Sequence, residues 1–298
     1  MEKKNKRLFG LLVLVLIVNL VVFLLPGKGS KTTFDEHMFA VADTASVSSV
    51  HLTLGDRVVE LTKSEDGWEL NGQYRIDEGL RRLLFSIMQR VRVKRPVHVA
   101  VKDGVKVKLN SDSFMVSGNA TQTKTYFTKD GKSYEVEIPG YRDYLASIFE
   151  LNADQWRDRL VFNGSWRTIQ RLNLDYIDSD EKDFEIAFNE EFFNVSGVNK
   201  LDSGLVVDYL NQFQYLQANE RISRGRFPRY DSLVESKPVA ILTLESINYS
   251  APETLIIFPS LEKEGFNLVK NSIGEMVIFD KRRISNMLMS RDHFKLAE

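Results

Sequence analysis

The sequence predicts an α+β protein, in which an N-terminal transmembrane helix is followed by two similar α+β repeats with mainly antiparallel sheets. Three observations lead to this prediction. A long apolar run stands near the N-terminus, and a short segment of the first half recurs in the second half. Elsewhere, alternating apolar and polar residues are separated by short Gly, Asp and Asn turns, a pattern typical of antiparallel strands.

The composition is that of an ordinary folded protein, with 298 residues of which 27% are charged and 43% hydrophobic. The 40 Lys and Arg residues balance 41 Asp and Glu residues. This balance argues against non-specific nucleic-acid binding, which needs a basic face. The absence of cysteine excludes disulfides, thiolate zinc sites, iron–sulfur clusters and a catalytic thiol. We therefore expect neither a cofactor nor a nucleic-acid partner.

The apolar run covers residues 8–25 and follows a basic tip at residues 3–7. At roughly 1.5 Å per residue it would span about 27 Å, close to the hydrocarbon thickness of a bilayer. Basic residues before the run predict a cytoplasmic N-terminus and a periplasmic remainder, hence a single-pass protein of the inner (cytoplasmic) membrane. The alternative is a cleaved signal peptide, but residues 27–29 are a poor cleavage site because Lys28 interrupts them.

The recurring segment aligns Trp68–Leu80 with Phe193–Leu205 without a gap. In each copy an alternating strand ends in a glycine turn, and an aspartate, Asp77 or Asp202, stands where a helix N-cap belongs. Apolar stripes at helical spacing follow, formed by Leu80, Leu83, Leu84, Ile87, Met88 and Val91 in the first copy and by Leu205, Val206, Tyr209, Leu210, Phe213 and Leu216 in the second. We divide the chain into tip, anchor and tether (residues 1–31), a first repeat (32–162) and a second repeat (163–298).

Strands are expected on both sides of each helix. Before the helices we predict Val50–Leu54 and Val58–Leu61 in the first repeat, and Ile169–Leu174 and Phe184–Phe188 in the second. After them we predict Val97–Val101, Val105–Leu109, Phe114–Val116, Thr125–Phe127 and Tyr134–Ile138, and then Val239–Leu244, Thr254–Phe258, Phe266–Val269 and Met276–Phe279. A short helix is expected to close each group, over residues 141–149 and 284–288.

This arrangement resembles the domain-of-unknown-function family 4340 of bacterial envelope proteins. The features that carry the resemblance are the anchor, Phe39–Val47, the Trp68–Gly72 hairpin with Tyr74–Asp77, and Leu151-Asn152 with Trp156–Arg159. The resemblance implies a membrane-anchored, extracytoplasmic accessory subunit, often encoded beside ABC-type export components tied to gliding and envelope assembly. It implies no catalytic residues.

Motifs for catalysis are missing from the sequence. Gly131-Lys132-Ser133 ends like a P-loop, but Tyr126 stands where the leading glycine belongs, so a hairpin turn is favoured. No Gly-x-Ser-x-Gly occurs, and the acidic run of residues 175–183 has no glycine for a calcium loop. We accordingly predict no enzyme and assign no catalytic, cofactor-binding or metal-binding residue.

Two basic clusters, which follow the two repeat helices, are the candidate partner-binding sites. They consist of Arg92, Lys94 and Arg95 in the first repeat, and Arg224, Arg226 and Arg229 in the second. Each is either a solvated face or a docking surface for acidic partner loops, anionic headgroups or glycans.

Two tripeptides fit a short Asp-Ser/Thr-apolar pattern that some bacteria use for O-glycosylation. They make Thr44 and Ser232 candidate O-glycosylation sites, although such tripeptides are common by chance.

The function expected from these features is that of a scaffold or adaptor subunit in an envelope transport, secretion or motility complex associated with an ABC transporter. Its partners would be other envelope membrane proteins, such as ABC-type permease or secretion subunits, reached by protein–protein interaction. The alternatives are an envelope enzyme acting on a glycan or lipid, and a periplasmic ligand-binding sensor. A deep cleft with two acids would favour the enzyme, and a closed apolar cavity between the repeats would favour the sensor.

If residues 8–25 are an uncleaved anchor, the full-length protein stays with the membrane pellet after washing with high salt and with alkaline carbonate. Immunoblotting of pellet and supernatant measures this. Release into the carbonate supernatant would contradict the anchor.

Overall fold

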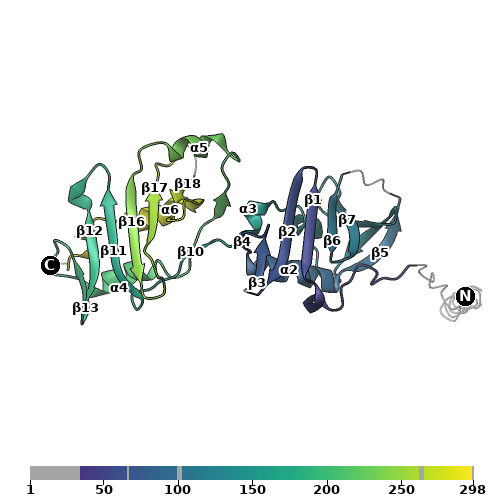
Figure 1. Cartoon of the computed structure of the whole chain (residues 1–298), viewed down its shortest axis with the longest axis horizontal. Coiled ribbons are helices and arrows are strands. Elements are labelled where there is room, and N and C mark those ends of the chain that lie inside the picture. The colour runs from purple at the N-terminus through teal and green to yellow at the C-terminus, as the bar shows by residue number, and fades with distance from the viewer. Residues whose placement is uncertain (1–33, 66, 99–102, 262–264, 297–298) are drawn as a thin grey trace, which may run out of the picture.

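The computed structural model describes residues 34–65, 67–98, 103–261 and 265–296. It is an α+β structure with two large, mostly antiparallel sheets, which confirms the predicted fold class at that level. The two sheets lie one after the other along the long axis (Figure 1). Within these described ranges no helix combines the length and apolar character needed to cross a membrane. The predicted span of residues 8–25 lies outside them.

Domain 1, residues 34–159, contains a nine-stranded sheet. Its strands are β1 (Ser49–Leu54), β2 (Arg57–Ser64), β3 (Gly67–Leu70), β4 (Tyr74–Arg75), β5 (Arg92–Val97), β6 (Val105–Leu109), β7 (Asp112–Gly118), β8 (Thr125–Lys129) and β9 (Lys132–Glu137). They pair in the order β4-β3-β2-β1-β6-β7-β8-β9-β5. The helices are α2 (Glu78–Arg90) and α3 (Ala153–Trp156), with 3-10 turns η1 (Thr44–Ser46) and η2 (Leu145–Ile148).

Domain 2, residues 160–296, contains an eight-stranded sheet. Its strands are β11 (Ile169–Tyr176), β12 (Phe184–Asn189), β13 (Phe192–Val195), β15 (Glu220–Ile222), β16 (Ala240–Ser246), β17 (Glu253–Ile257), β18 (Phe266–Lys270) and β19 (Met276–Asp280). They pair in the order β13-β12-β11-β16-β17-β18-β19-β15, which is the order of domain 1 without its short strand β4. The helices are α4 (Ser203–Asn211), α5 (Pro228–Val234) and α6 (Lys281–Met287), with η3 (Asp180–Lys182) and η4 (Arg291–Phe294). Strands β10 (Leu160–Phe162) and β14 (Leu216–Gln217) form a separate pair.

Equivalent aspartates begin the main helix of each domain. The carboxylate of Asp77 accepts hydrogen bonds from the backbone N–H groups of the second and third helical residues, at 2.8 and 3.1 Å. Asp202 caps α4 in the same way, at 2.9 and 3.2 Å. The backbone N–H of each cap donates to the carbonyl of a fully buried aromatic residue, Trp156 for Asp77 and Phe294 for Asp202. The predicted N-caps are therefore confirmed in both domains.

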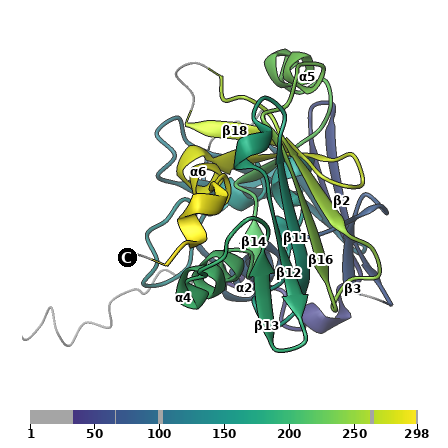
Figure 2. The same ribbon diagram turned by 90° about the vertical axis from the view of Figure 1, so that its left-hand side faces the viewer.

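The two main helices differ from the predicted stripes. In α2, Phe85 is buried and Leu83 is 41% exposed, so the buried face is rotated from the predicted one toward Phe85. Because neighbouring helical positions are only about 100° apart, packing on a curved sheet decides which of them faces inward. Helix α4 ends at Asn211, and Leu216 lies on strand β14. Figure 2 shows α2 and α4 on the same side of their sheets.

Three segments differ from the sequence prediction. Strand β5 begins at Arg92, directly after α2, where the prediction began a strand at Val97, and residues 99–102 lie outside the described ones. Helix α5, with Pro228 at its first position, is an addition to domain 2 that periodicity did not indicate. Strand β10 was assigned to the first repeat, but Phe162 packs in the second core and β10 pairs with β14.

Replacing Asp202 by Ala is expected to lower the free energy of unfolding by about 1 kcal/mol, because two backbone N–H groups lose their acceptor. Asp202→Asn keeps a side-chain oxygen in place and is the matched control, with a change of a few tenths of a kcal/mol. Urea unfolding followed by circular dichroism measures both. Equal losses in the two variants would show that the cap contributes through charge rather than through the hydrogen bonds.

Candidate functional site

The first predicted basic cluster lies on edge strand β5 and is largely neutralised. Lys94 Nζ is 2.8 Å from the Glu137 carboxylate, and Arg95 donates from Nε and Nη2 to one oxygen of Glu135 at 2.9 and 2.8 Å. The hydrogen bond to Glu137 raises the pKa of Lys94 above its ordinary value. Arg92 is exposed and pairs across the ladder with Glu137. The carboxylates of Glu135 and Glu137 on β9 therefore neutralise much of the positive charge of this cluster.

The second predicted basic cluster is split by the structure. Arg224 is exposed and 3.6 Å from Glu235, and the guanidinium of Arg229 lies over the ring of Phe227 at 5.4 Å. Arg226 turns toward domain 1, where it contacts the Asp154 carboxylate at 3.2 Å. Its side chain is 25% exposed. Arg226 also contacts the Glu220 carboxylate of its own domain at 2.7 Å, so it joins carboxylates of both domains. Its guanidinium lies over the same Phe227 ring as that of Arg229, at 4.8 Å.

The two candidate O-glycosylation sites have hydroxyls engaged in hydrogen bonds. Thr44 Oγ1 accepts from Gln89 Nε2 at 2.9 Å, and Ser232 Oγ donates to the carbonyl of Pro228 at 3.0 Å. Ser232 is exposed on α5, whereas Thr44 is partly covered beside α2.

The contact between the domains centres on Glu275, in the turn between β18 and β19. One carboxylate oxygen pairs with Arg157 of domain 1 and the other with Arg221 of domain 2. Both arginines are almost fully buried, at 5% and 9% exposure. We call Asp154, Arg157, Arg221, Arg226 and Glu275 the junction cluster.

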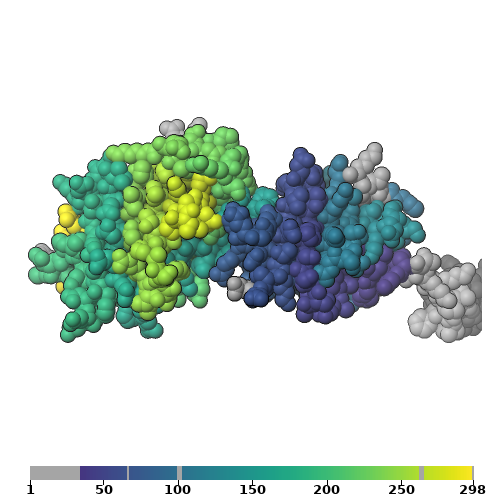
Figure 3. Space-filling model, in the orientation of Figure 1, coloured from purple at the N-terminus to yellow at the C-terminus, as the bar shows by residue number. Residues whose placement is uncertain are grey.

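Further hydrogen bonds complete the junction. Arg221 Nη2 donates to the carbonyl of Leu160 at 2.8 Å, and Arg221 Nε donates to the carbonyl of Asp158. Burial lowers the pKa of Arg221 from its ordinary value, while the neighbouring Glu275 carboxylate opposes that shift. On the other side, Asp154 accepts from the hydroxyl and the backbone N–H of Ser223 at 2.6 and 3.0 Å. Figure 3 shows the two domains meeting across this contact.

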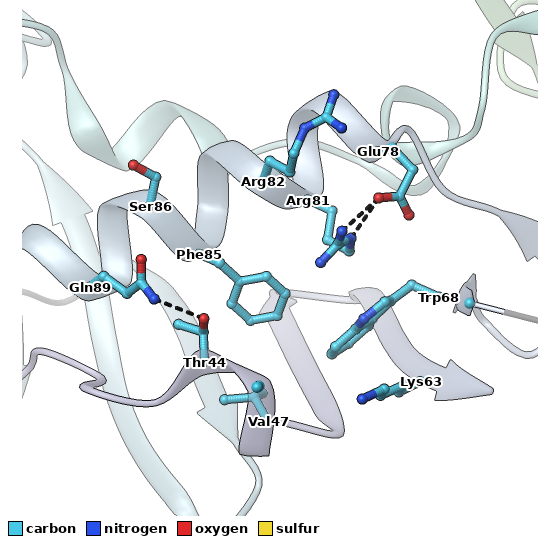
Figure 4. Close-up of a pocket in the computed structure, with 12 residues that line it drawn as sticks. Thr44, Val47, Lys63, Trp68, Glu78, Arg81, Arg82, Phe85, Ser86 and Gln89 are labelled. Atoms are coloured by element: carbon cyan, nitrogen blue, oxygen red, sulfur yellow. Dashed lines mark hydrogen bonds and ion pairs between the residues drawn. The ribbon is translucent and has the colours of Figure 1, made fainter. Parts of the chain in front are cut away.

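A groove lies between helix α2 and strands β2 and β3 of domain 1 (Figure 4). We call it the Trp68 groove; Lys63, Trp68, Glu78, Arg81, Arg82 and Phe85 line it, with a volume of about 650 Å³. The rings of Trp68 and Phe85 form its apolar wall, with centroids 5.2 Å apart. Arg81 is held by Glu78 at 2.7 Å.

A second pocket, of about 770 Å³, continues the Trp68 groove toward domain 2. The two pockets share Gly67, Trp68, Glu78 and Arg82. Asp158, Arg159 and Gln217 close the second pocket on the side of the junction. Together they form a trench that runs from α2 to the second domain.

The candidate partner-binding residues predicted from the sequence do not include Lys63, Trp68, Arg81 or Arg82. A signal was present in the repeat itself. Lys63 stands opposite Trp68 in the β2–β3 hairpin, and the corresponding hairpin of domain 2 has Phe188 opposite Phe193. At these matched positions domain 1 has the cation Lys63 where domain 2 has the aromatic Phe188, and this difference indicates the groove.

Comparison with protein-family models, curated proteins and solved structures gives no match for this chain. The resemblance to the domain-of-unknown-function family 4340 therefore stays a prediction.

Replacing Glu275 by Gln is expected to lower the free energy of unfolding by about 2–3 kcal/mol, because two buried guanidinium groups lose the charge that neutralises them. The matched control is Glu235→Gln, which weakens an exposed pair and is expected to cost less than about 0.5 kcal/mol. Urea unfolding compares the two variants. Small-angle scattering is expected to show a larger maximum dimension for Glu275→Gln only, and identical behaviour would contradict a locking role for Glu275.

Proposed function

We propose that this chain is a membrane-tethered scaffold or adaptor of the bacterial envelope, which holds partner proteins at a fixed distance from the membrane. The observation that carries the proposal is the junction cluster. Buried ion pairs of Glu275 with Arg157 and Arg221 join the two domains and oppose a change in their relative orientation. A scaffold needs such a fixed spacing between binding surfaces, whereas a flexible linker would leave the domains independent.

An internal duplication supports this proposal. Both sheets use one strand order, and both main helices begin at equivalent aspartates, Asp77 and Asp202. Two domains with the same strand order and the same capped helix provide two surfaces of similar shape, which differ in their side chains. Two such surfaces could bind two different subunits of a partner complex, one on each domain.

The place where the chain enters domain 1 supports a position close to the membrane. The backbone N–H of Val93 on β5 donates to the carbonyl of Glu36 at 2.8 Å, so the chain enters domain 1 beside this edge strand. A fully extended chain between residues 25 and 34 spans at most roughly 30 Å. With residues 8–25 in the membrane, domain 1 lies close to the bilayer, and β5 is at the end of domain 1 away from domain 2 (Figure 1).

The charged side chains at the junction argue against the sensor alternative. A ligand-binding sensor would hold a closed apolar cavity between the repeats, whereas the pocket of about 310 Å³ at this contact is lined by the charged groups of Arg157, Arg221 and Glu275. An adaptor restricted to the membrane surface gains affinity for neighbouring subunits through its raised effective concentration. We accordingly favour ABC-type permease or secretion subunits as partners.

The proposal is tested by isolating the full-length protein from its native membrane in a gentle detergent and quantifying co-purified proteins by mass spectrometry. Envelope transport or secretion subunits are expected at a fixed ratio. A version in which the apolar run is replaced by a cleavable signal peptide is the control, and it is expected to recover less partner. Purification of the native protein alone would contradict the scaffold function.

A further inference from the structure

The cations that line the Trp68 groove in domain 1 have apolar counterparts in domain 2. Counting from the capping aspartates Asp77 and Asp202, the positions of Arg81 and Arg82 in α2 correspond to Val206 and Val207 in α4. Phe193, the counterpart of Trp68, is 2% exposed, and Val206 is fully buried. Phe188, the counterpart of Lys63, is 51% exposed. Matched positions therefore carry apolar side chains in domain 2 and cations beside Trp68 in domain 1.

From this difference we infer that the Trp68 groove binds an acidic peptide segment of a partner protein. Acidic side chains of the segment bind Lys63 and Arg82, and an apolar side chain packs against Trp68 and Phe85. The inference rests on the proposed adaptor function, for which it names a binding site and the chemistry of its ligand.

The charges of the groove favour an anionic ligand. Its lining contains three cations, Lys63, Arg81 and Arg82, and the single carboxylate of Glu78. That carboxylate is already paired with Arg81. Across the described part of the chain, no carboxylate forms an ion pair with Lys63 or Arg82. Both side chains are exposed and available to carboxylates of a ligand.

The aromatic wall favours a ligand that also carries an apolar side chain. Trp68 is partly buried, and its ring meets that of Phe85 at an angle of 60°. Figure 4 shows the ring of Phe85 directed toward Trp68, with Lys63 beside them. Aromatic rings in a recessed site beside cations are typical of the central contacts of protein interfaces.

The length of the trench and an open strand edge favour a peptide over a small anion. The two adjoining pockets share four lining residues and together extend from α2 to Gln217 of domain 2, farther than a single carboxylate or phosphate requires. The second pocket also carries the carboxylates of Glu69, Asp77 and Asp158, so the acidic side chains of the ligand are expected in the Trp68 groove and not beyond it. Strand β3 pairs with β4 only through Glu69 and Leu70, so no described strand flanks Gly67–Trp68 on that side. An extended peptide adds to such an edge through its backbone. A lipid headgroup would use the cations alone.

The inference is tested by fluorescence anisotropy with the full-length protein in a nonionic detergent. The probe is a short fluorescein-labelled peptide of alternating glutamate and leucine residues. We expect saturable binding that weakens with added salt. The variant Lys63→Glu/Arg82→Glu is expected to raise Kd about tenfold or more. Trp68→Ala is expected to weaken binding without changing its salt dependence.

Matched controls separate the groove from general electrostatics. Lys106→Glu/Lys108→Glu changes the net charge equally at two exposed positions of β6 outside the groove, and it is expected to bind like the native protein. A peptide with glutamine in place of glutamate is expected not to bind. Equal weakening by both charge-reversal pairs, or no saturable binding by the native protein, would overturn the inference. So would groove-dependent binding of phosphatidylglycerol vesicles without binding of the peptide.

The native-membrane isolation separates this inference from the adaptor function. If the native protein recovers no envelope subunit, the adaptor function fails whatever the peptide result. If native protein and Lys63→Glu/Arg82→Glu recover the same subunits equally, the adaptor function stands and the groove inference fails. Recovery that is lost only in the groove variant supports the inference when the peptide titration agrees.

Discussion

The Glu275 carboxylate is the group on which the arrangement of the two domains depends, because it neutralises guanidinium groups from both of them. A buried arginine without a partner costs several kcal/mol, so a relative displacement of the domains is opposed at the first lost contact. Apolar contacts tolerate sliding more easily, since they are not directional. The second pair, Asp154 with Arg226, adds a separate point of attachment and thereby opposes rotation about the first.

The two domains share one structural frame but differ in the surface beside the capped helix. The frame consists of the shared strand order, the capping aspartates Asp77 and Asp202, and the buried aromatic residues Trp156 and Phe294 that receive the N–H groups of the caps. These features stabilise the core of each domain. The surface beside the cap is where the domains diverge, with charged residues on α2 and valines on α4. The surface beside the cap therefore differs between the domains, although the strand order and the capping aspartate are the same.

The sequence predicted what local chemistry decides, namely the alternating strands, the aspartate caps and the turns at Gly72 and Gly197, where φ is 63° and 73°. It did not predict contacts that join distant residues. Arg157 and Glu275 are 118 positions apart, and no periodicity relates them. Arg226 was predicted to face a partner because its neighbours are basic, yet it pairs with two carboxylates, Asp154 of domain 1 and Glu220 of domain 2. Such pairs follow from how the domains meet, which local sequence patterns do not encode.

The junction and the Trp68 groove belong to one structural unit. Asp158 and Arg159 close the second pocket of the groove, and the carbonyl of Asp158 accepts a hydrogen bond from Arg221 of the junction cluster. Gln217, which lines the same pocket, belongs to domain 2, and Leu160 beside it receives a second hydrogen bond from Arg221. The relative position of the domains thus sets the width of the trench at this end. A ligand that fills the trench contacts both domains, so its binding free energy depends on the orientation that Glu275 maintains.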